Sequence, residues 1–125
     1  MKLVILESPF APFEIADIKR TEEQNIEYAR ACVRHSLSQG EAPIASHLLY
    51  TQPGILNDYV PSERQWGIDA GLAWKQVAQG SVVYVDFGIT RGMHYGIEAA
   101  KAAGIEIEYR YIYDFGPLTH RRMFV

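Results

Sequence analysis

The sequence predicts a small α/β domain with a parallel sheet, and two observations carry this prediction. Runs such as Lys2–Leu6 and Ser81–Phe87 are almost continuously apolar, which is typical of strands buried on both faces. Segments with helical spacing alternate with these runs, and strand–helix–strand connections force parallel pairing with right-handed crossovers. We therefore expect a single domain over residues 1–125, a three-layer flavodoxin-like or Rossmann-like sheet of four mainly parallel strands in the order 2-1-3-4, with flanking helices.

The first half of the chain is expected to hold two strands and one clear helix. Ser8–Pro12 stops the first strand, because each proline withholds a donor and fixes φ, and an irregular loop with room for one helical turn follows. Thr21–Gln24 has the pattern of a capping box, and the helix that it opens ends at Gly40. Pro43–His47 is the expected second strand, and Leu48–Val60 is a long connection.

The second half repeats this alternation. Ser62–Gln65 has the pattern of a second capping box, and Gly80 is expected to end the helix that it opens. Within this helix, Gly67 and Gly71 are four residues apart, so one side can approach a neighbouring element closely.

The third strand, Ser81–Phe87, leads through the turn Gly88–Gly92 into a third helix that Gly104 closes. The last strand is expected over Ile105–Tyr113, where apolar and charged residues alternate. Such alternation is typical of a half-exposed strand near a sheet edge or an interface.

The composition limits the classes of partner and site. The net charge is −3, from 12 basic and 15 acidic residues, so bulk nucleic acid is not an expected partner. Cys32 is the single cysteine, and no two histidines have the spacing of a zinc helix motif, so we expect no metal site and no cofactor. Glu7 interrupts the first apolar run far short of a signal peptide or membrane span, and a cytoplasmic protein without a membrane partner is expected.

The fold class itself predicts where a ligand would bind. In open parallel sheets, ligands bind beyond the carboxyl ends of the strands, where the strand order reverses. Here that point lies between the first and third strands. It brings Glu7–Phe10 beside Asp86–Gly88, next to the helix start at Thr90–Gly92.

The residue types at this point suit a nucleotide. Free N–H groups at a helix start favour a phosphate, and Arg91 adds a charge-assisted bond. Asp86 would take ribose hydroxyls, while Phe10 and Phe87 would stack on a base. The alternative is that the glycines of this turn serve only backbone geometry and that both rings close the top of the core.

Further candidates lie outside this turn. Arg64 and Arg91 occupy first turns of helices, where a cation is unfavourable unless a bound anion or a subunit interface compensates it. His47 is either a ligand contact or base, or a structural histidine. No catalytic residue is assigned. The full set of expected ligand-binding residues is Ser8, Pro9, Phe10, Arg34, His47, Arg64, Asp86, Phe87, Gly88, Thr90, Arg91, Gly92, Met93 and Arg110.

Several short segments resemble the nucleoside 2-deoxyribosyltransferase-like families. Ile5–Phe10 resembles their first strand and loop, and Val82–Asp86 with the turn to Gly92 resembles a later strand and its helix. Small phage and prophage members share Ala45–Tyr50 and the stretch from Asp86 through Met93. The resemblance implies a nucleotide pocket in an α/β fold.

One position departs from the pattern of these families. Their nucleophilic glutamate lies four residues after the glycine equivalent to Gly92, and here Gly96 stands in its place, with Met93 replacing a threonine. Glu98 lies two residues further on, rotated by about 200° around a helix, so it does not substitute. Since covalent glycosyl transfer needs that carboxylate, the departure implies binding without turnover.

Binding without turnover is the action of a molecular sponge. The chain resembles the phage Thoeris anti-defence sponges, which implies sequestration of a cyclic ADP-ribose-type or cyclic nucleotide signal in the bacterial host cytoplasm. It also implies a homo-oligomer with pockets at or near subunit contacts. The candidate contacts are the last-strand face with Tyr109, Tyr111 and Tyr113, and the tail Leu118–Val125.

Two other classes of function stay open. An N-glycosidase or deoxyribosyltransferase-like enzyme would use Glu7, Asp86 or Glu98 as its carboxylate, and release of free base would indicate it. A protein-interaction module would keep the pocket only as a vestige, and a stable partner with a collapsed pocket would indicate that alternative.

Overall fold

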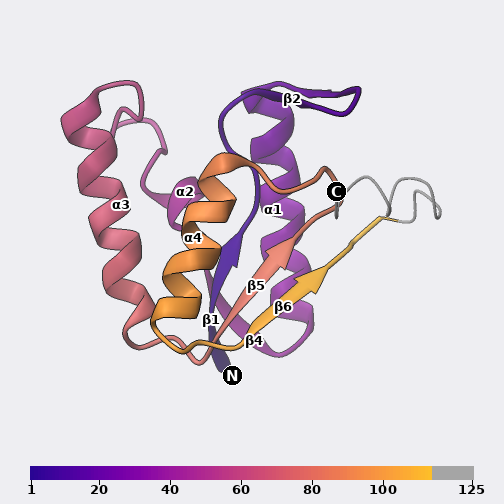
Figure 1. The fold of residues 1–125 in the computed structure, drawn as a ribbon, viewed down its shortest axis with the longest axis vertical. Helices are drawn as coiled ribbons and strands as arrows, with labels where there is room; N and C mark the ends of the chain where they lie inside the picture. The colour runs from indigo at the N-terminus through magenta and orange to yellow at the C-terminus, as the bar shows by residue number, and fades with distance from the viewer. Residues whose placement is uncertain (114–125) are drawn as a thin grey trace.

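The computed structural model describes residues 1–113, and its centre is a four-stranded sheet in the order β4-β1-β5-β6 (Figure 1). All three neighbouring pairs of strands run parallel. The predicted α/β class and the predicted 2-1-3-4 order are confirmed. The four strands are β1 (Lys2–Glu7), β4 (Glu41–Ile44), β5 (Gly80–Tyr84) and β6 (Ile107–Arg110).

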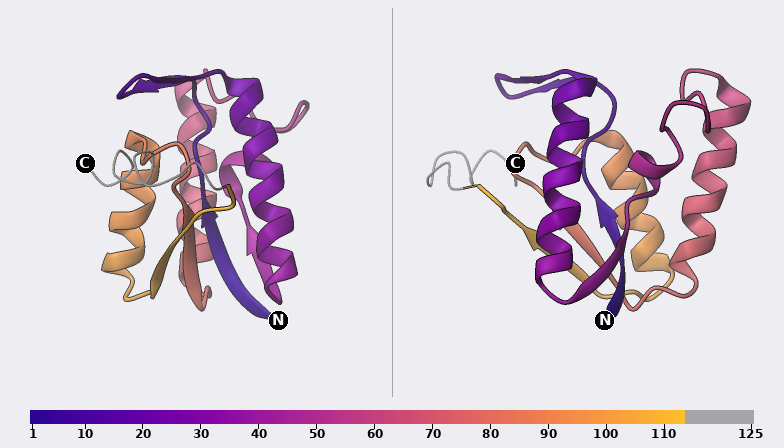
Figure 2. Two further views of the ribbon diagram at one scale, coloured as in Figure 1. Left: turned by 90° about the vertical axis from the view of Figure 1, so that its right-hand side faces the viewer. Right: turned by 180° about the vertical axis from the view of Figure 1, so that it is seen from behind.

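Helices cover both faces of this sheet. α1 (Glu22–Ser38) and α4 (Arg91–Ala102) lie on opposite sides of it (Figure 2). α3 (Pro61–Lys75) lies beside α4 and packs mainly against α4 and the short α2 (Ser46–Leu49) rather than against the strands. Because α3 lies away from the sheet, space is left between α3, α4 and the end of β1.

The core is divided by β5, whose side chains are all buried. Alternate side chains of a strand point to opposite faces. Val82 and Tyr84 belong to the cluster on the α1 side, together with Tyr28, whereas Val83 and Val85 pack with buried side chains of α4. This two-sided burial is the reason that the strand is an almost continuous apolar run.

The helix starts were predicted with mixed success. Thr21 caps α1 as expected, since its hydroxyl accepts from the Gln24 N–H and the Gln24 side chain accepts from the Thr21 N–H. The second capping box, Ser62–Gln65, is wrong. α3 begins at Pro61 with Val60 at its N-cap and no side-chain cap, because proline at the first helical position is already fixed at a helical φ.

A β-hairpin replaces the irregular loop expected after the first strand. β2 (Phe13–Ile15) and β3 (Ile18–Arg20) pair antiparallel, joined by the two residues Ala16 and Asp17. Both linking residues have positive φ, 45° and 70°, as a tight two-residue hairpin turn requires. Alanine is an unusual choice there, so the sequence gives no signal for this turn.

Several strand boundaries also differ from the expectation. The third strand covers Gly80–Tyr84 instead of Ser81–Phe87. The second strand covers Glu41–Ile44 instead of Pro43–His47, and residues 46–49 turn into α2. Pro43 is tolerated because, within residues 1–113, β4 is an edge strand with β1 as its one neighbour. The last strand is shorter than the expected Ile105–Tyr113 and covers Ile107–Arg110.

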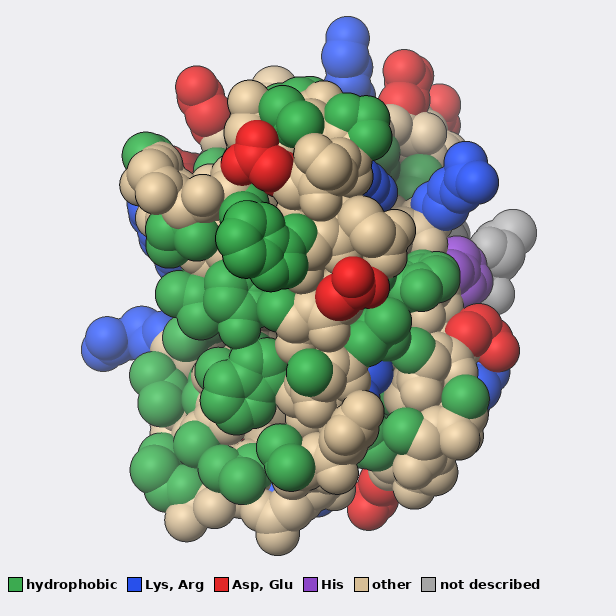
Figure 3. Space-filling model, turned by 90° about the vertical axis from the view of Figure 1, so that its left-hand side faces the viewer, with side chains coloured by type: hydrophobic (Ala, Val, Ile, Leu, Met, Phe, Trp, Pro, Cys, Tyr) green, Lys and Arg blue, Asp and Glu red, His purple; other side chains and the backbone are tan. Residues whose placement is uncertain are grey.

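Exposed hydrophobic side chains gather on the α3 side of the molecule (Figure 3). Trp66 and Val77 are 68% and 60% exposed there. On β6 and just after it, Tyr109 and Tyr113 are also exposed, while the other expected contact segment, Leu118–Val125, lies outside the described residues. No helix in the described part of the chain is long and apolar enough to cross a membrane.

Candidate functional site

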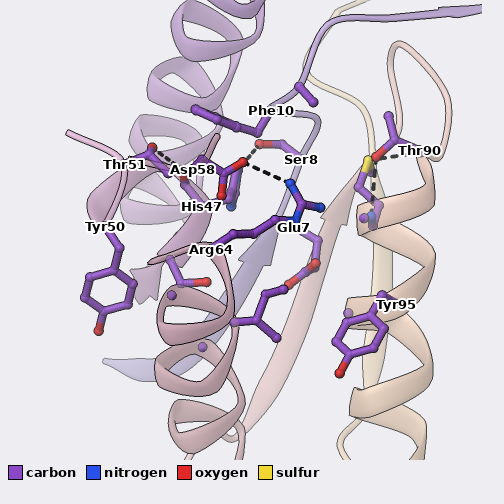
Figure 4. A pocket seen from close by; sticks show the side chains of 18 of the residues that line it. Glu7, Ser8, Phe10, His47, Tyr50, Thr51, Asp58, Arg64, Thr90 and Tyr95 are labelled. Atoms are coloured by element: carbon purple, nitrogen blue, oxygen red, sulfur yellow. Dashed lines mark hydrogen bonds and ion pairs between the residues drawn. The ribbon is translucent and has the colours of Figure 1, made fainter. Parts of the chain in front are cut away.

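A cavity of about 600 Å³ lies beyond the carboxyl end of β1, between α3 and α4 (Figure 4). Small-molecule sites usually have volumes of about 300–1,000 Å³, so the size suits one ligand. Eight of the expected ligand-binding residues line the cavity. They are Ser8, Phe10, His47, Arg64, Thr90, Arg91, Gly92 and Met93.

Glu7, the last residue of β1, carries its carboxylate deep in this cavity. The Glu7 side chain is 13% exposed, and the Nζ of Lys75, from the last turn of α3, lies 3.6 Å from its Oε1. Burial raises the pKa of Glu7 to about 6, against the opposing effect of the Lys75 ammonium. The inner end of the cavity therefore holds a carboxylate–ammonium pair that is nearly removed from water.

Gly96 of α4 leaves the room that this carboxylate occupies. A β-carbon on residue 96 would lie 2.1 Å from Oε2 of Glu7 and 2.6 Å from its Cδ, far closer than any van der Waals contact. Gly96 therefore removes one potential carboxylate position and admits the Glu7 carboxylate from β1 to the same space. Although position 96 carries no glutamate, the pocket still contains a carboxylate, that of Glu7.

The substitution Gly96→Ala is expected to lower the free energy of unfolding by about 1–3 kcal/mol, because the new methyl group must push Glu7 away from Lys75. Chemical denaturation measures this loss. Gly92→Ala on the same helix is the control, since a β-carbon there meets nothing within 4 Å and gains helix propensity. If Gly96→Ala were as stable as Gly92→Ala, the packing of Glu7 against α4 would be contradicted.

Ser8 and His47 form a neutral polar pair on the cavity wall. The Ser8 hydroxyl and Nε2 of His47 are 2.7 Å apart. Burial lowers the pKa of His47 to about 4, and the charge of Lys75 acts in the same direction. The imidazole is therefore uncharged at physiological pH, and the pair offers hydrogen bonds rather than charge.

Positive charge comes from two arginines. Arg64 of α3 points into the cavity, where its Nη1 lies 3.0 Å from Oδ2 of Asp58 (Figure 4). Arg91 lies in the first turn of α4 and forms no ion pair with any residue from 1 to 113. The Met93 N–H is already bonded to the Thr90 hydroxyl, so an anion at this helix start would rely mainly on the two guanidinium groups.

Asp86 is a correction to the expected site. Its carboxylate is fully buried on the α1 side of the sheet, where it accepts hydrogen bonds from the Tyr28 hydroxyl and from the N–H groups of Ile112 and Tyr113. Because the chain itself satisfies these oxygens, Asp86 is not free to take ribose hydroxyls. It ties the segment after β6 to the end of β5.

The expected pair of stacking rings is also separated. Phe10 lines the cavity, but Phe87 does not. The Phe87 ring packs edge-on against Tyr28, with ring centroids 4.8 Å apart, and the Arg20 guanidinium lies 3.8 Å from the centroid of Phe87. Of the expected pair, Phe10 alone lies at the cavity, whose wall also includes the aromatic residues Phe13, Tyr50 and Tyr95.

Four more expected residues lie outside the cavity. Arg110 donates to the two carboxylate oxygens of Glu41 through Nη1 and Nη2, at 2.7 and 2.6 Å, on the α1 side of the sheet. Arg34 is exposed on α1, Pro9 is buried in the loop after β1, and Gly88 occupies a positive-φ turn beside the hairpin. None of these four contributes to the cavity wall.

The sequence interpretation missed several cavity residues. Glu7 was placed at the expected ligand point and considered as an alternative catalytic carboxylate, but it was not among the expected ligand-binding residues. The spacing of Gly67 and Gly71 indicated that one side of α3 could approach a neighbour closely. Both glycines line the cavity. Within residues 1–113, no cluster of three or more His, Cys, Asp or Glu side chains could hold a metal ion. The other lining residues that the expected ligand-binding set lacks are Ala11, Pro12, Phe13, Ser46, Tyr50, Thr51, Leu56, Asp58, Glu63, Ile68, Leu72, Lys75, Tyr95 and Gly96.

The fold and the cavity define a class of protein: a small parallel α/β domain with a partly enclosed, mainly apolar site that holds a few charged side chains at the carboxyl edge of its sheet. The chain belongs to the family described as a domain of unknown function, DUF7768, whose model matches residues 2–110. That match includes every residue that lines the cavity. No curated protein matches the chain.

Proposed function

We propose that the cavity binds a nucleotide-derived small molecule and holds it without converting it. One observation carries this proposal: Phe10, Arg64 and Arg91, from three separate elements, line one cavity. An aromatic ring can stack on a base, and guanidinium groups bind phosphate oxygens through charge-assisted hydrogen bonds. The ligand would be a cyclic ADP-ribose-type molecule or a cyclic nucleotide.

The two arginines support an anionic ligand, although the three basic residues of the cavity wall are balanced in number by three acidic ones, Glu7, Asp58 and Glu63. Arg64 is half exposed at the cavity and Arg91 is exposed in the first turn of α4. Next to a positive helix end, a bound phosphate would relieve the unfavourable position of the Arg91 cation. Asp58 neutralises part of the Arg64 charge in the free protein, and a phosphate would compete with it.

Retention without chemistry is supported by the glycine at position 96. A helix position that carries the nucleophile in similar families has no side chain here. Such a protein would act as a sponge, which keeps a signalling nucleotide from its receptor in the cytoplasm of a phage-infected cell. Assembly into a homo-oligomer is part of this proposal.

A second candidate function, N-glycoside hydrolysis, is favoured by the position of Glu7. Its carboxylate lies where a side chain on residue 96 would begin. In this reaction Glu7 would attack the anomeric carbon, the bond to the base would break, and the base would leave with the bonding electrons and take up a proton. Water would then hydrolyse the glycosyl ester and regenerate the carboxylate.

Calorimetry against nucleoside monophosphates, cyclic nucleotides and ADP-ribose, followed by chromatography of the recovered ligand, tests the proposal. We expect binding at micromolar concentrations and recovery of intact ligand. Absence of binding to every compound would overturn the proposed function. Recovery of free base would replace sequestration by the second candidate.

Removing either cavity arginine is expected to weaken nucleotide binding. Arg91→Ala and Arg64→Ala should each lower the affinity about tenfold or more, because each removes a hydrogen bond to a charged group. Arg34→Ala is the matched control, since Arg34 is exposed on α1 and lies outside the cavity. Calorimetry measures all three, and an equal loss for Arg34→Ala would show that the effect is nonspecific.

A further inference from the structure

The carboxylate–ammonium pair at the inner end of the cavity has few hydrogen-bond partners among residues 1–113. Glu7 and Lys75 are both nearly buried, with side chains 13% and 8% exposed. Their closest approach, 3.6 Å, is longer than a normal hydrogen bond, and no other residue between 1 and 113 hydrogen-bonds to the Glu7 carboxylate. A buried ion pair is costly unless further hydrogen bonds satisfy it, so a ligand group that hydrogen-bonds to both Glu7 and Lys75 would be stabilised here.

The chemistry of the pair restricts what that group is. A phosphate would be repelled by the Glu7 carboxylate, and a cationic group would be repelled by the Lys75 ammonium. A neutral group with adjacent donors and acceptors satisfies both. Two neighbouring hydroxyls donate to the two carboxylate oxygens, and their own oxygens accept from the ammonium.

We propose that Glu7 and Lys75 form a subsite for the vicinal diol of a sugar ring. This inference rests on the proposed nucleotide-binding function and deepens it, because it orients the ligand. It favours a cyclic ADP-ribose-type molecule that keeps a sugar diol over a 3′,5′-cyclic nucleotide, which has no free vicinal diol. The ribose diol would lie against the Glu7 carboxylate, and the phosphate would lie near Arg64 and Arg91.

Binding of a diol at this subsite is expected to change the number of protons bound to Glu7. Glu7 faces Lys75 from α3, the neutral His47 from α2, and uncharged Gly96 from α4; Arg64 and Arg91 lie further out on the same cavity. With a pKa of about 6, roughly half of Glu7 is protonated at pH 6. Hydroxyls that donate to the charged carboxylate lower this pKa, so diol binding releases protons near pH 6 and none near pH 8.

The test compares adenosine 5′-monophosphate with its 2′,3′-dideoxy analogue by calorimetry at pH 6 and pH 8, in buffers of different ionisation enthalpy. The phosphate monoester also titrates near pH 6 in both nucleotides, so the difference between them is diagnostic. We expect the diol-bearing nucleotide to bind at least about tenfold more tightly and to release more protons at pH 6. At pH 8 the difference in proton release should vanish.

Glu7→Gln should abolish the extra proton release and reduce the affinity ratio, whereas Glu98→Gln, on the exposed side of α4, should preserve both. The nucleotide comparison uses the unaltered protein, so it decides the proposal even if Glu7→Gln fails to fold. Equal affinity and equal proton release for the two nucleotides would overturn the diol subsite and leave the proposed function intact. Binding of neither would overturn the diol subsite, and it would overturn the proposed function too if cyclic nucleotides and ADP-ribose also fail to bind. Recovery of free adenine would assign Glu7 to hydrolysis instead.

Discussion

Asp86→Ala is expected to lower the free energy of unfolding by about 3–5 kcal/mol. The substitution leaves the Tyr28 hydroxyl and the N–H groups of Ile112 and Tyr113 without their acceptor, and each unsatisfied buried group costs about 1–3 kcal/mol. Against a typical total stability of about 5–15 kcal/mol, this loss is large. Urea denaturation monitored by circular dichroism measures it.

Asp69→Ala provides the comparison for Asp86→Ala. Asp69 is an exposed aspartate on α3 with one side-chain hydrogen bond, to Gln65, so its loss should change stability by less than about 0.5 kcal/mol. An Asp86→Ala protein with full stability but without nucleotide binding would return Asp86 to the ligand site. Loss of stability with binding retained in the folded fraction would confirm its structural role.

Arg110→Met is expected to have an effect of similar size on the other buried ion pair. Arg110 and Glu41 are 10% and 9% exposed, and removing one partner of a buried pair typically costs about 3–5 kcal/mol. The double variant Arg110→Met with Glu41→Leu should recover much of this loss, because it leaves no unpaired charge. If the double variant were less stable than Arg110→Met alone, the pair would not be the cause.

The same pair predicts an acid dependence. The hydrogen bond from Arg110 lowers the pKa of Glu41 below its usual value of 4.5, and Arg110 also lowers the pKa of Glu108. A carboxyl group with a lowered pKa in the folded state stabilises the protein above pH 4.5. That contribution is lost as the pH falls through the lower, folded-state pKa. The stability gap between the unaltered protein and Arg110→Met should therefore narrow below pH 4.5, which denaturation at several pH values measures.

The sheet was predictable because burial on both faces gives strands a recognisable sequence. β5 is apolar at successive positions, and α1 begins with a capping box that forms as expected. The hairpin at Ala16 and Asp17 was not predictable, since neither residue is a usual choice for two positive φ angles. Helix α3 begins at Pro61, before the expected capping box Ser62–Gln65, because the fixed φ of proline suits the first helical position.

The alternation of side chains along a strand decides which residues of β1 and β5 face the site. Val82 and Tyr84 face α1, so Asp86, two residues further on, points to the same side, away from the cavity. By the same rule Leu6 faces α1, and Glu7 points to the α4 side. Applied to the sequence, this rule would have separated Asp86 from the site and placed Glu7 in it.

The rest of the site depends on how the helices sit. Lys75 reaches Glu7 because α3 packs against α2 and α4, and no periodicity in the sequence reports that placement. Gly96 matters through the space beside Glu7, which is a property of two elements far apart in the chain. Arg64 and Arg91 were predictable, since cations at helix starts need compensation.

The hydrogen bonds to Asp86 also show that the folded unit extends past the end of the family match. The family match stops at residue 110, and by then the sheet and the whole cavity wall have been formed. The N–H groups that satisfy the buried carboxylate belong to Ile112 and Tyr113, beyond that limit. A chain that ended at Arg110 would keep every strand and helix of the fold. Its buried Asp86 carboxylate would nevertheless lack two of its hydrogen-bond donors. The boundary drawn by similarity and the boundary required for folding stability therefore differ by a few residues.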